Sequence, residues 1–205
     1  ATSGGSISTL GLIFARLKKI PFVFTYYTRW NHFTHYFFKG KIIRPWMMEA
    51  ASKIFCNRCD CIIVPMPKIK EELISFGVKK PIAVIPSGVD LDKFNQQKKG
   101  FLRKKTGIID GKILLYVGRL EKEKSVDFLI KAFQIIHAKD SEANLVLVGD
   151  GTMKKSLKQL AEELGIARNV YFTGLIDSEK MNRVYADAEI FVFASTTETQ
   201  GMVVL

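Results

Sequence analysis

Two cations, Arg119 and Lys124, are the residues whose types and spacing most directly indicate a binding chemistry. They lie in a short polar segment that follows the apolar run 113–117 and Gly118. A guanidinium offers a planar fork of donors and an ammonium a mobile point charge, and both suit a phosphate or diphosphate. The alternative is that both side chains are solvated loop residues without a ligand.

The elements around these cations would place them at the edge of a sheet. The apolar run 112–117 predicts a buried strand, and apolar residues recur at helical spacing through the predicted helix 125–138. In an open α/β sheet, ligands bind outside the carboxyl ends of the strands. A strand, a polar loop and a returning helix therefore predict a ligand crevice at this loop.

Strands and helices alternate along the whole chain, which predicts an α/β protein with parallel sheets. The polar stretch 95–100 is the best candidate for a linker, so we expect two units of similar plan, 1–99 and 100–205. In the first unit we predict a helix from Ile7 that ends before Pro21, strands 22–26, 61–64 and 82–85, and helices 43–55 and 68–76. In the second we predict strands 112–117, 144–148, 169–173 and 190–194, and helices 125–138, 152–164 and 178–187.

The positive charge is concentrated in the first half of the chain. The 205 residues carry a net charge of +11. Residues 1–99 contain 16 lysines and arginines against 6 acidic residues, and no acidic residue precedes Glu49. This indicates an anionic partner, either a membrane surface or a nucleic acid. No apolar run approaches the roughly 20 residues that span a bilayer, so contact with a membrane would be peripheral.

The three cysteines, Cys56, Cys59 and Cys61, are expected to be core or near-surface thiols. An odd number without a secretory signal favours a reducing, cytosolic setting. A zinc site would need a fourth ligand, and no second cluster of suitable spacing occurs, so we expect no zinc site at these cysteines. The chain begins without Met and stops inside an apolar run, so we expect a piece cut at both ends.

The motifs of the second half, in order, resemble a known family. KILLYVGRLEKEKSVDFLIKAF, NLVLVGDG, NVYFTGLIDSEKMNRVYADAEIFVFAS and TETQG resemble the donor-binding domain of a retaining family-4 glycosyltransferase with the GT-B fold. IPFVFTYYTRWNHFTHYF, CDCIIVPMPKIKEEL and IPSGVDLDKF resemble the later part of its acceptor-binding domain. Within the family, the bacterial glycolipid synthases that glycosylate diacylglycerol are the most similar. The resemblance implies two Rossmann-like lobes with parallel sheets, both incomplete in this chain.

The resemblance assigns the donor site. Arg119 and Lys124 would hold the diphosphate of a nucleotide-sugar and stabilise the leaving group, with Ser125 where the family usually has Gly. Glu198 would grip the sugar, and the second Glu of the motif would lie one residue past Leu205. Gln200 stands where an aromatic is common, which leaves the sugar preference open. The implied donor-binding residues are Gly118, Arg119, Lys124, Gly149, Asp150, Gly174, Leu175, Ile176, Glu198, Thr199, Gln200 and Gly201.

Alternative interpretations stay open for the segment 149–151 and for Glu198. Gly149-Asp150-Gly151 is either a phosphate-binding nest or a tight strand-to-helix turn capped by Asp150. The segment 174–176 would receive the nucleotide base through backbone groups. Glu198 could instead be a solvated carboxylate at the start of a helix.

The acceptor side is indicated less sharply. Tyr27 stands where the family often has His, and Gly88 lies in a turn that resembles the family's N-G-V-D turn near the cleft. His32 and His35 are not assigned as catalytic bases. One further segment is both aromatic and cationic, with the cations Arg29, Lys39 and Lys41 around Trp30, Phe33, Tyr36, Phe37 and Phe38. We interpret it as an interfacial segment on anionic lipid, and the alternative is a core face with a solvated rim.

We therefore expect a cytoplasmic enzyme, peripheral on the inner face of the membrane, that moves a hexose from a nucleotide-sugar such as a UDP-hexose to a lipid such as diacylglycerol. No metal or cofactor is expected, and the oligomeric state is left open. This piece by itself is expected to be inactive. The alternatives are a soluble or polysaccharide acceptor, and a non-enzymatic nucleotide or nucleic-acid binding module, which the lack of an RNA-binding signature disfavours.

Overall fold

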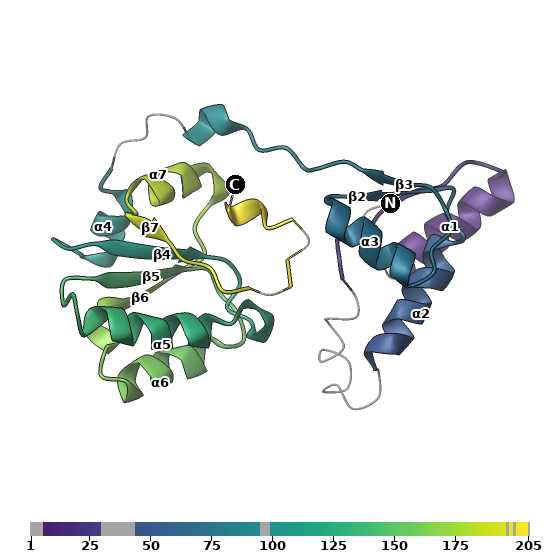
Figure 1. The fold of residues 1–205 in the computed structure, drawn as a ribbon. Coiled ribbons are helices and arrows are strands. Elements are labelled where there is room, and N and C mark those ends of the chain that lie inside the picture. The colour runs from purple at the N-terminus through teal and green to yellow at the C-terminus, as the bar shows by residue number, and fades with distance from the viewer. Residues whose placement is uncertain (1–5, 30–43, 95–98, 196, 199, 205) are drawn as a thin grey trace. The chain divides into compact units, whose positions relative to one another are not determined.

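Two separate parallel sheets, one in each half of the chain, organise the fold (Figure 1). The computed structural model describes residues 6–29, 44–94, 99–195, 197–198 and 200–204. The chain divides into two compact units: unit 1 is Ala1–Gly88 with Thr197–Met202, and unit 2 is Val89–Thr196 with Val203–Leu205. Parallel strands alternating with helices confirm the predicted α/β class.

Unit 1 contains a three-stranded sheet in the order β1-β2-β3, parallel throughout. Its core is formed by the buried faces of the strands and helices, including Phe24, Tyr26, Ile62 and Leu73. Helices α2 and α3 each begin at a proline, which needs no N–H donor there and presets the helical φ. The elements are α1 (Ser6–Lys18), β1 (Val23–Thr25), α2 (Pro45–Cys56), β2 (Cys61–Val64), α3 (Pro67–Ser75) and β3 (Ile82–Val84).

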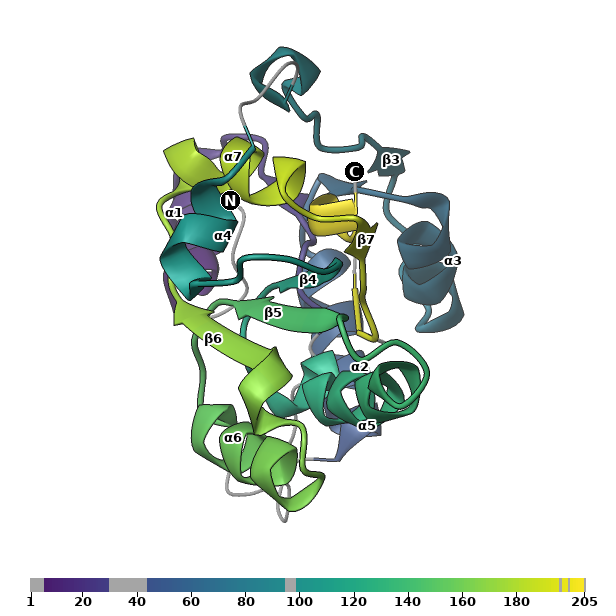
Figure 2. The ribbon, with the colours of Figure 1, turned by 90° about the vertical axis from the view of Figure 1, so that its left-hand side faces the viewer.

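Unit 2 contains a four-stranded parallel sheet in the order β6-β5-β4-β7. Helices α5 and α6 cover one face of this sheet, and α4 and α7 cover the other (Figure 2). The elements are α4 (Phe101–Thr106), β4 (Ile113–Val117), α5 (Val126–His137), β5 (Asn144–Val148), α6 (Lys154–Glu163), β6 (Val170–Gly174), α7 (Met181–Ala186) and β7 (Ile190–Phe191).

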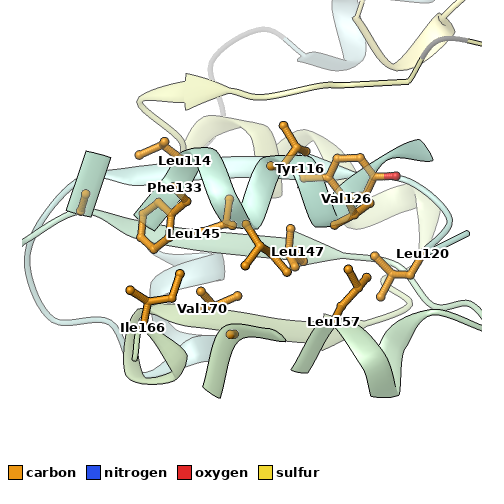
Figure 3. Packing of buried hydrophobic residues seen from close by; sticks show 14 residues of the cluster. Leu114, Tyr116, Leu120, Val126, Phe133, Leu145, Leu147, Leu157, Ile166 and Val170 are labelled. Carbon is orange, nitrogen blue, oxygen red and sulfur yellow. The ribbon is translucent and has the colours of Figure 1, made fainter. Parts of the chain in front are cut away.

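Alternation along β4 explains why its apolar run is continuous. Leu114 and Tyr116 pack in the core beneath α5 and α6 (Figure 3), whereas Ile113 and Leu115 pack on the other face with α4 and α7. Since both faces of a parallel sheet are covered by helices, its strands are apolar at every position. The central strands are therefore held from both sides, and their carboxyl ends are fixed in space.

Helix α4 was not predicted, although the other expected helices and strands are confirmed with shifted ends. Its N-terminus is capped by a distant residue: the buried carboxylate of Asp187 accepts hydrogen bonds from the backbone N–H groups of Gly100, Leu102 and Arg103. The cap residue Gly100 offers no side chain for this purpose. The partner lies 85 residues from Leu102, so no local pattern reveals this helix.

Within the described ranges, no helix is both long and apolar enough to cross a bilayer.

Candidate functional site

Three loops meet at the carboxyl edge of the sheet in unit 2, where Arg119 and Lys124 lie. They follow β4, β5 and β6, which run parallel, so their ends share one edge. The N–H of Gly118 donates to the carbonyl of Val148 (3.0 Å), and the N–H of Leu120 donates to the carbonyl of Asp150 (2.9 Å). The N–H of Gly149 donates to the carbonyl of Gly174 (2.9 Å). Backbone pairing therefore continues past the strands and locks the three loops together.

Glycine is required where these loops touch. A Cβ atom on Gly149 would lie 1.9 Å from the carbonyl oxygen of Gly118, and one on Gly151 would lie 2.4 Å from that of Leu120. Both contacts are with backbone and cannot be relieved by rotating a side chain. The G-D-G segment is thus a close packing point for the loop that carries Arg119.

Asp150 lies in this packing point but does not cap α6. That helix begins at Lys154, and the Asp150 carboxylate instead accepts the N–H of Gly151 (2.9 Å) and pairs with the Lys154 ammonium (2.7 Å). The hydrogen bond from Lys154 lowers the pKa of Asp150. The capping interpretation is therefore wrong, whereas a phosphate role for this segment stays a prediction.

Arg119 is oriented by two contacts of its own loop and strand. Its Nη2 donates to Oε1 of Glu123 at 3.0 Å, and the Arg119 side chain is 59% exposed while that of Glu123 is only 3% exposed. The hydroxyl of the buried Tyr116 donates to the Arg119 carbonyl at 2.8 Å. A guanidinium carries five donors in a fixed fork, so the exposed side of Arg119 can still bind an oxyanion.

Lys124 ends the 3₁₀ turn η4 (Lys122–Lys124), and its ammonium lies 6.0 Å from the ring centroid of Phe193. That ring in turn stacks on Tyr116, with centroids 6.2 Å apart. One aromatic pair therefore contacts both predicted phosphate ligands: Tyr116 through the Arg119 carbonyl and Phe193 through the Lys124 ammonium. Sequence reasoning missed Tyr116, Glu123 and Phe193, of which only the i,i+4 pair of Arg119 and Glu123 had a local signal.

Ser125 follows Lys124 in the left-handed conformation, with φ +51°. This region costs most residues energy and suits glycine, which gives a physical reason for the glycine that the family usually has at this position. The loop nevertheless closes here, with the Ser125 N–H donating to the Lys122 carbonyl.

The loop after β6 carries the predicted base-binding residues. Gly174 has φ +73° and turns the chain, Leu175 is 80% exposed, and Ile176 is half-buried against the core beside α4 and α7. Leu175 therefore projects into solvent, and Ile176 anchors the loop.

Glu198 lies in a segment that packs with unit 1. The Gln200 side-chain amide pairs with both backbone groups of one residue: Oε1 accepts the Ser87 N–H at 2.9 Å, and Nε2 donates to the Ser87 carbonyl at 2.9 Å. The hydroxyls of Tyr27 and Ser87 are 2.8 Å apart. Tyr27 follows β1 and Ser87 follows β3, so the segment joins the carboxyl edge of that sheet. Sequence reasoning missed Ser87, and Thr199 lies outside the described residues.

The structure separates the predicted donor residues into two groups. Glu198, Gln200 and Gly201 belong to unit 1 with Tyr27 and Gly88. Gly88 has neither a positive φ nor any atom within 4 Å of an added Cβ, so its backbone does not require glycine. The other group belongs to unit 2 and comprises Gly118, Arg119, Lys124, Gly149, Asp150, Gly174, Leu175 and Ile176.

One expected lipid-facing cation has a different role. Arg29 is mostly buried and pairs with Glu72 of α3, Nε to Oε2 at 2.9 Å, so it is part of a structural ion pair and its assignment to a lipid surface is wrong. The rest of that segment, Trp30, Phe33, Tyr36, Phe37, Phe38, Lys39 and Lys41, lies outside the described residues, as do His32 and His35.

The buried cysteines behave as core residues. Cys56 and Cys59 are fully buried, and burial raises the pKa of their thiols to about 12 and about 11. Cys61 is partly exposed. In the part of the chain that the structure describes, no three His, Cys, Asp or Glu side chains come together as a metal ion would need.

Comparison with known proteins places this chain among enzymes that transfer sugars. The model of "Glycosyl transferases group 1" matches residues 98–205, more than half of the chain, and that of "Glycosyltransferase Family 4" matches residues 2–93. The chain belongs to the glycosyl transferases group 1 family.

Two curated relatives share a name. The alpha-monoglucosyldiacylglycerol synthase of Streptococcus pneumoniae is 36% identical over 98% of this chain and 47% of its own length. That of Acholeplasma laidlawii is 29% identical over 96% of this chain and 52% of its own length. The chain thus spans about half the length of these relatives.

The fold is that of known GT-B proteins. The structure resembles that of Anabaena HepE in complex with UDP and glucose, with a TM-score of 0.78 and 20% identity over 96% of this chain and 52% of that one. This confirms the expected GT-B type of fold, with two Rossmann-like units.

Proposed function

We propose that this chain is part of a retaining glycosyltransferase that moves a hexose from a nucleotide-sugar, such as a UDP-hexose, to the hydroxyl of a lipid such as diacylglycerol. The observation that carries the proposal is the fixed pair of cations at the carboxyl edge of the sheet in unit 2. The names of the two curated relatives support the lipid acceptor. The HepE complex with UDP and glucose supports the donor class.

The chemistry explains why cations are needed here. When the bond between the anomeric carbon and the β-phosphate breaks, the electron pair stays on the nucleoside diphosphate, whose negative charge grows. Arg119 and Lys124 would neutralise this charge, and because the loops already hold them, little reorganisation is required at the moment of reaction. These cations would supply the positive charge that this step needs, and the proposal includes no metal or other cofactor.

The remaining roles follow the division that the sequence predicts, between residues 1–99 and residues 100–205. Residues 100–205 would bind the donor, with the backbone at 174–176 receiving the base and the Gly149-Asp150 segment near the phosphates. Residues 1–99 would bind the acceptor, with Tyr27 and Gly88 on that side. Glu198, followed by Thr199, Gln200 and Gly201, would hold the sugar hydroxyls.

A peripheral position on an anionic membrane, on its cytoplasmic face, is part of the proposal. The excess of lysine and arginine in residues 1–99, 16 against 6 acidic residues, supports it. A soluble acceptor is the alternative, and sedimentation with vesicles of phosphatidylglycerol and of phosphatidylcholine separates the two. Binding to the anionic vesicles alone, weakened by salt, is expected, and no binding to either would favour the soluble acceptor.

The donor class is tested by calorimetric titration of the chain with UDP-glucose, GDP-mannose and single-stranded oligonucleotide. We expect saturable binding of one nucleotide-sugar and none of the oligonucleotide. Steeply salt-dependent binding of the oligonucleotide, without binding of a nucleotide-sugar, would instead indicate a nucleic-acid binding module.

A further inference from the structure

Gln200 has an unusual set of contacts for a residue that follows the predicted sugar-binding carboxylate. Its amide oxygen and nitrogen engage the N–H and the carbonyl of the same residue, Ser87, each at 2.9 Å. An amide side chain that pairs with both groups of one residue is fixed in direction as well as in distance. Residues 87 and 200 are 113 positions apart, so this contact closes a long loop of the chain.

The contact is extended by Tyr27. Its hydroxyl lies 2.8 Å from the hydroxyl of Ser87, so Ser87 is held through its side chain by the end of β1 and through its backbone by Gln200. Gln200 and Ser87 are both partly buried, which limits competition from water. We refer to Tyr27, Ser87 and Gln200 as the amide clamp.

We propose that Gln200 is a positioning residue, whose pairing with the Ser87 backbone fixes the segment that carries Glu198 and thereby sets how the sugar is gripped. The effect on sugar binding rests on the proposed function, whereas the amide clamp itself rests only on the contacts of Tyr27, Ser87 and Gln200. It also gives the glutamine a reason to stand at this position: its side-chain amide can accept from the Ser87 N–H and donate to the Ser87 carbonyl, which a phenyl ring cannot do. Gln200 is only two positions after Glu198 in the chain, so a shift of one moves the other.

The clamp is tested first without any ligand, by hydrogen exchange of the peptide that spans residues 197–204. Gln200→Met keeps the length of the side chain but removes both hydrogen bonds, and we expect exchange to be faster by about tenfold. Ser87→Ala is the matched control: it removes the contact with the Tyr27 hydroxyl but keeps the Ser87 backbone groups with which Gln200 pairs, so it should speed exchange much less than Gln200→Met. Equal exchange in wild type and Gln200→Met would overturn the clamp.

Its consequence is tested by comparing the affinities for UDP-glucose and UDP in the same variants. In Gln200→Met we expect the ratio of the affinity for UDP-glucose to that for UDP to fall several-fold, while the affinity for UDP is retained. Gln200→Glu keeps only the hydrogen-bond acceptor, so its ratio should lie between those of wild type and Gln200→Met. An unchanged ratio would refute the positioning role. If Arg119→Ala fails to weaken UDP binding, the proposed function is wrong, while the exchange experiment still decides the clamp.

Discussion

Replacing Gly149 by Ala should unlock the loops that hold Arg119. The new Cβ would lie 1.9 Å from the Gly118 carbonyl oxygen, so the loops after β4 and β5 must part. The backbone N–H groups of Gly118, Leu120 and Gly149 donate three of the hydrogen bonds that join these loops to each other and to the loop after β6, and each contributes about 1 kcal/mol. With the φ of +136° adding strain, we expect a loss of about 3–4 kcal/mol in the free energy of unfolding.

Gly165→Ala is the matched control for this substitution. Gly165 also has a positive φ, +72°, but an added Cβ would meet nothing within 4 Å, so only the backbone strain of about 1 kcal/mol applies. Urea unfolding followed by circular dichroism should show a midpoint lower by roughly 1 M in Gly149→Ala than in Gly165→Ala. Both tryptophans lie within unit 1, so their fluorescence should shift less. Equal midpoints of the two variants would refute the steric argument.

Three further predictions concern stability. Ser125→Gly should raise the free energy of unfolding by up to about 1 kcal/mol, because Ser125 has φ +51°, and a lower urea midpoint would contradict this. Asp187→Ala should cost about 2–3 kcal/mol in the same assay, because α4 loses the carboxylate that caps it, and an unchanged midpoint would refute the distant cap. Burial raises the pKa of Cys56 and Cys59 from 9.0 to about 12 and about 11, so the unfolded thiols ionise first and stability should fall as pH rises from about 9 to 11. The double variant Cys56→Ala with Cys59→Ala should show a shallower decline, and equal slopes would contradict the thiol origin.

The sequence predicted the elements that depend on local pattern. The strands of unit 2 are continuous apolar runs because both faces are covered, and the amphipathic spacing of α5 is visible in Val126, Leu129, Ile130 and Phe133. Helix α4 escaped prediction because its cap, Asp187, is distant in sequence.

The candidate site likewise combines residues that local sequence predicts with residues that only the fold brings together. The positions of Arg119 and Lys124 were predicted because a strand end, a polar loop and a helix start follow one another in the chain. The residues that orient them, Tyr116 and Phe193, were not predicted because their stacking arises only when β4 and the segment after β7 lie side by side. The pairing of Gln200 with Ser87 likewise requires the fold, because it joins residues far apart in the sequence.

The central claim is that Arg119 and Lys124 bind a diphosphate, and the most direct test is the difference in affinity between UDP and UMP. We expect UDP to bind more tightly than UMP to the wild-type chain, and this difference to shrink by about tenfold to a hundredfold in Arg119→Ala and in Lys124→Ala, because each loses a charged hydrogen bond. Lys122→Ala, in the same turn, is the matched control and should keep the difference. Far-ultraviolet circular dichroism should verify that Arg119→Ala folds, because the variant leaves the buried Glu123 without this ion pair. A difference between UDP and UMP that survives in both variants would contradict the account.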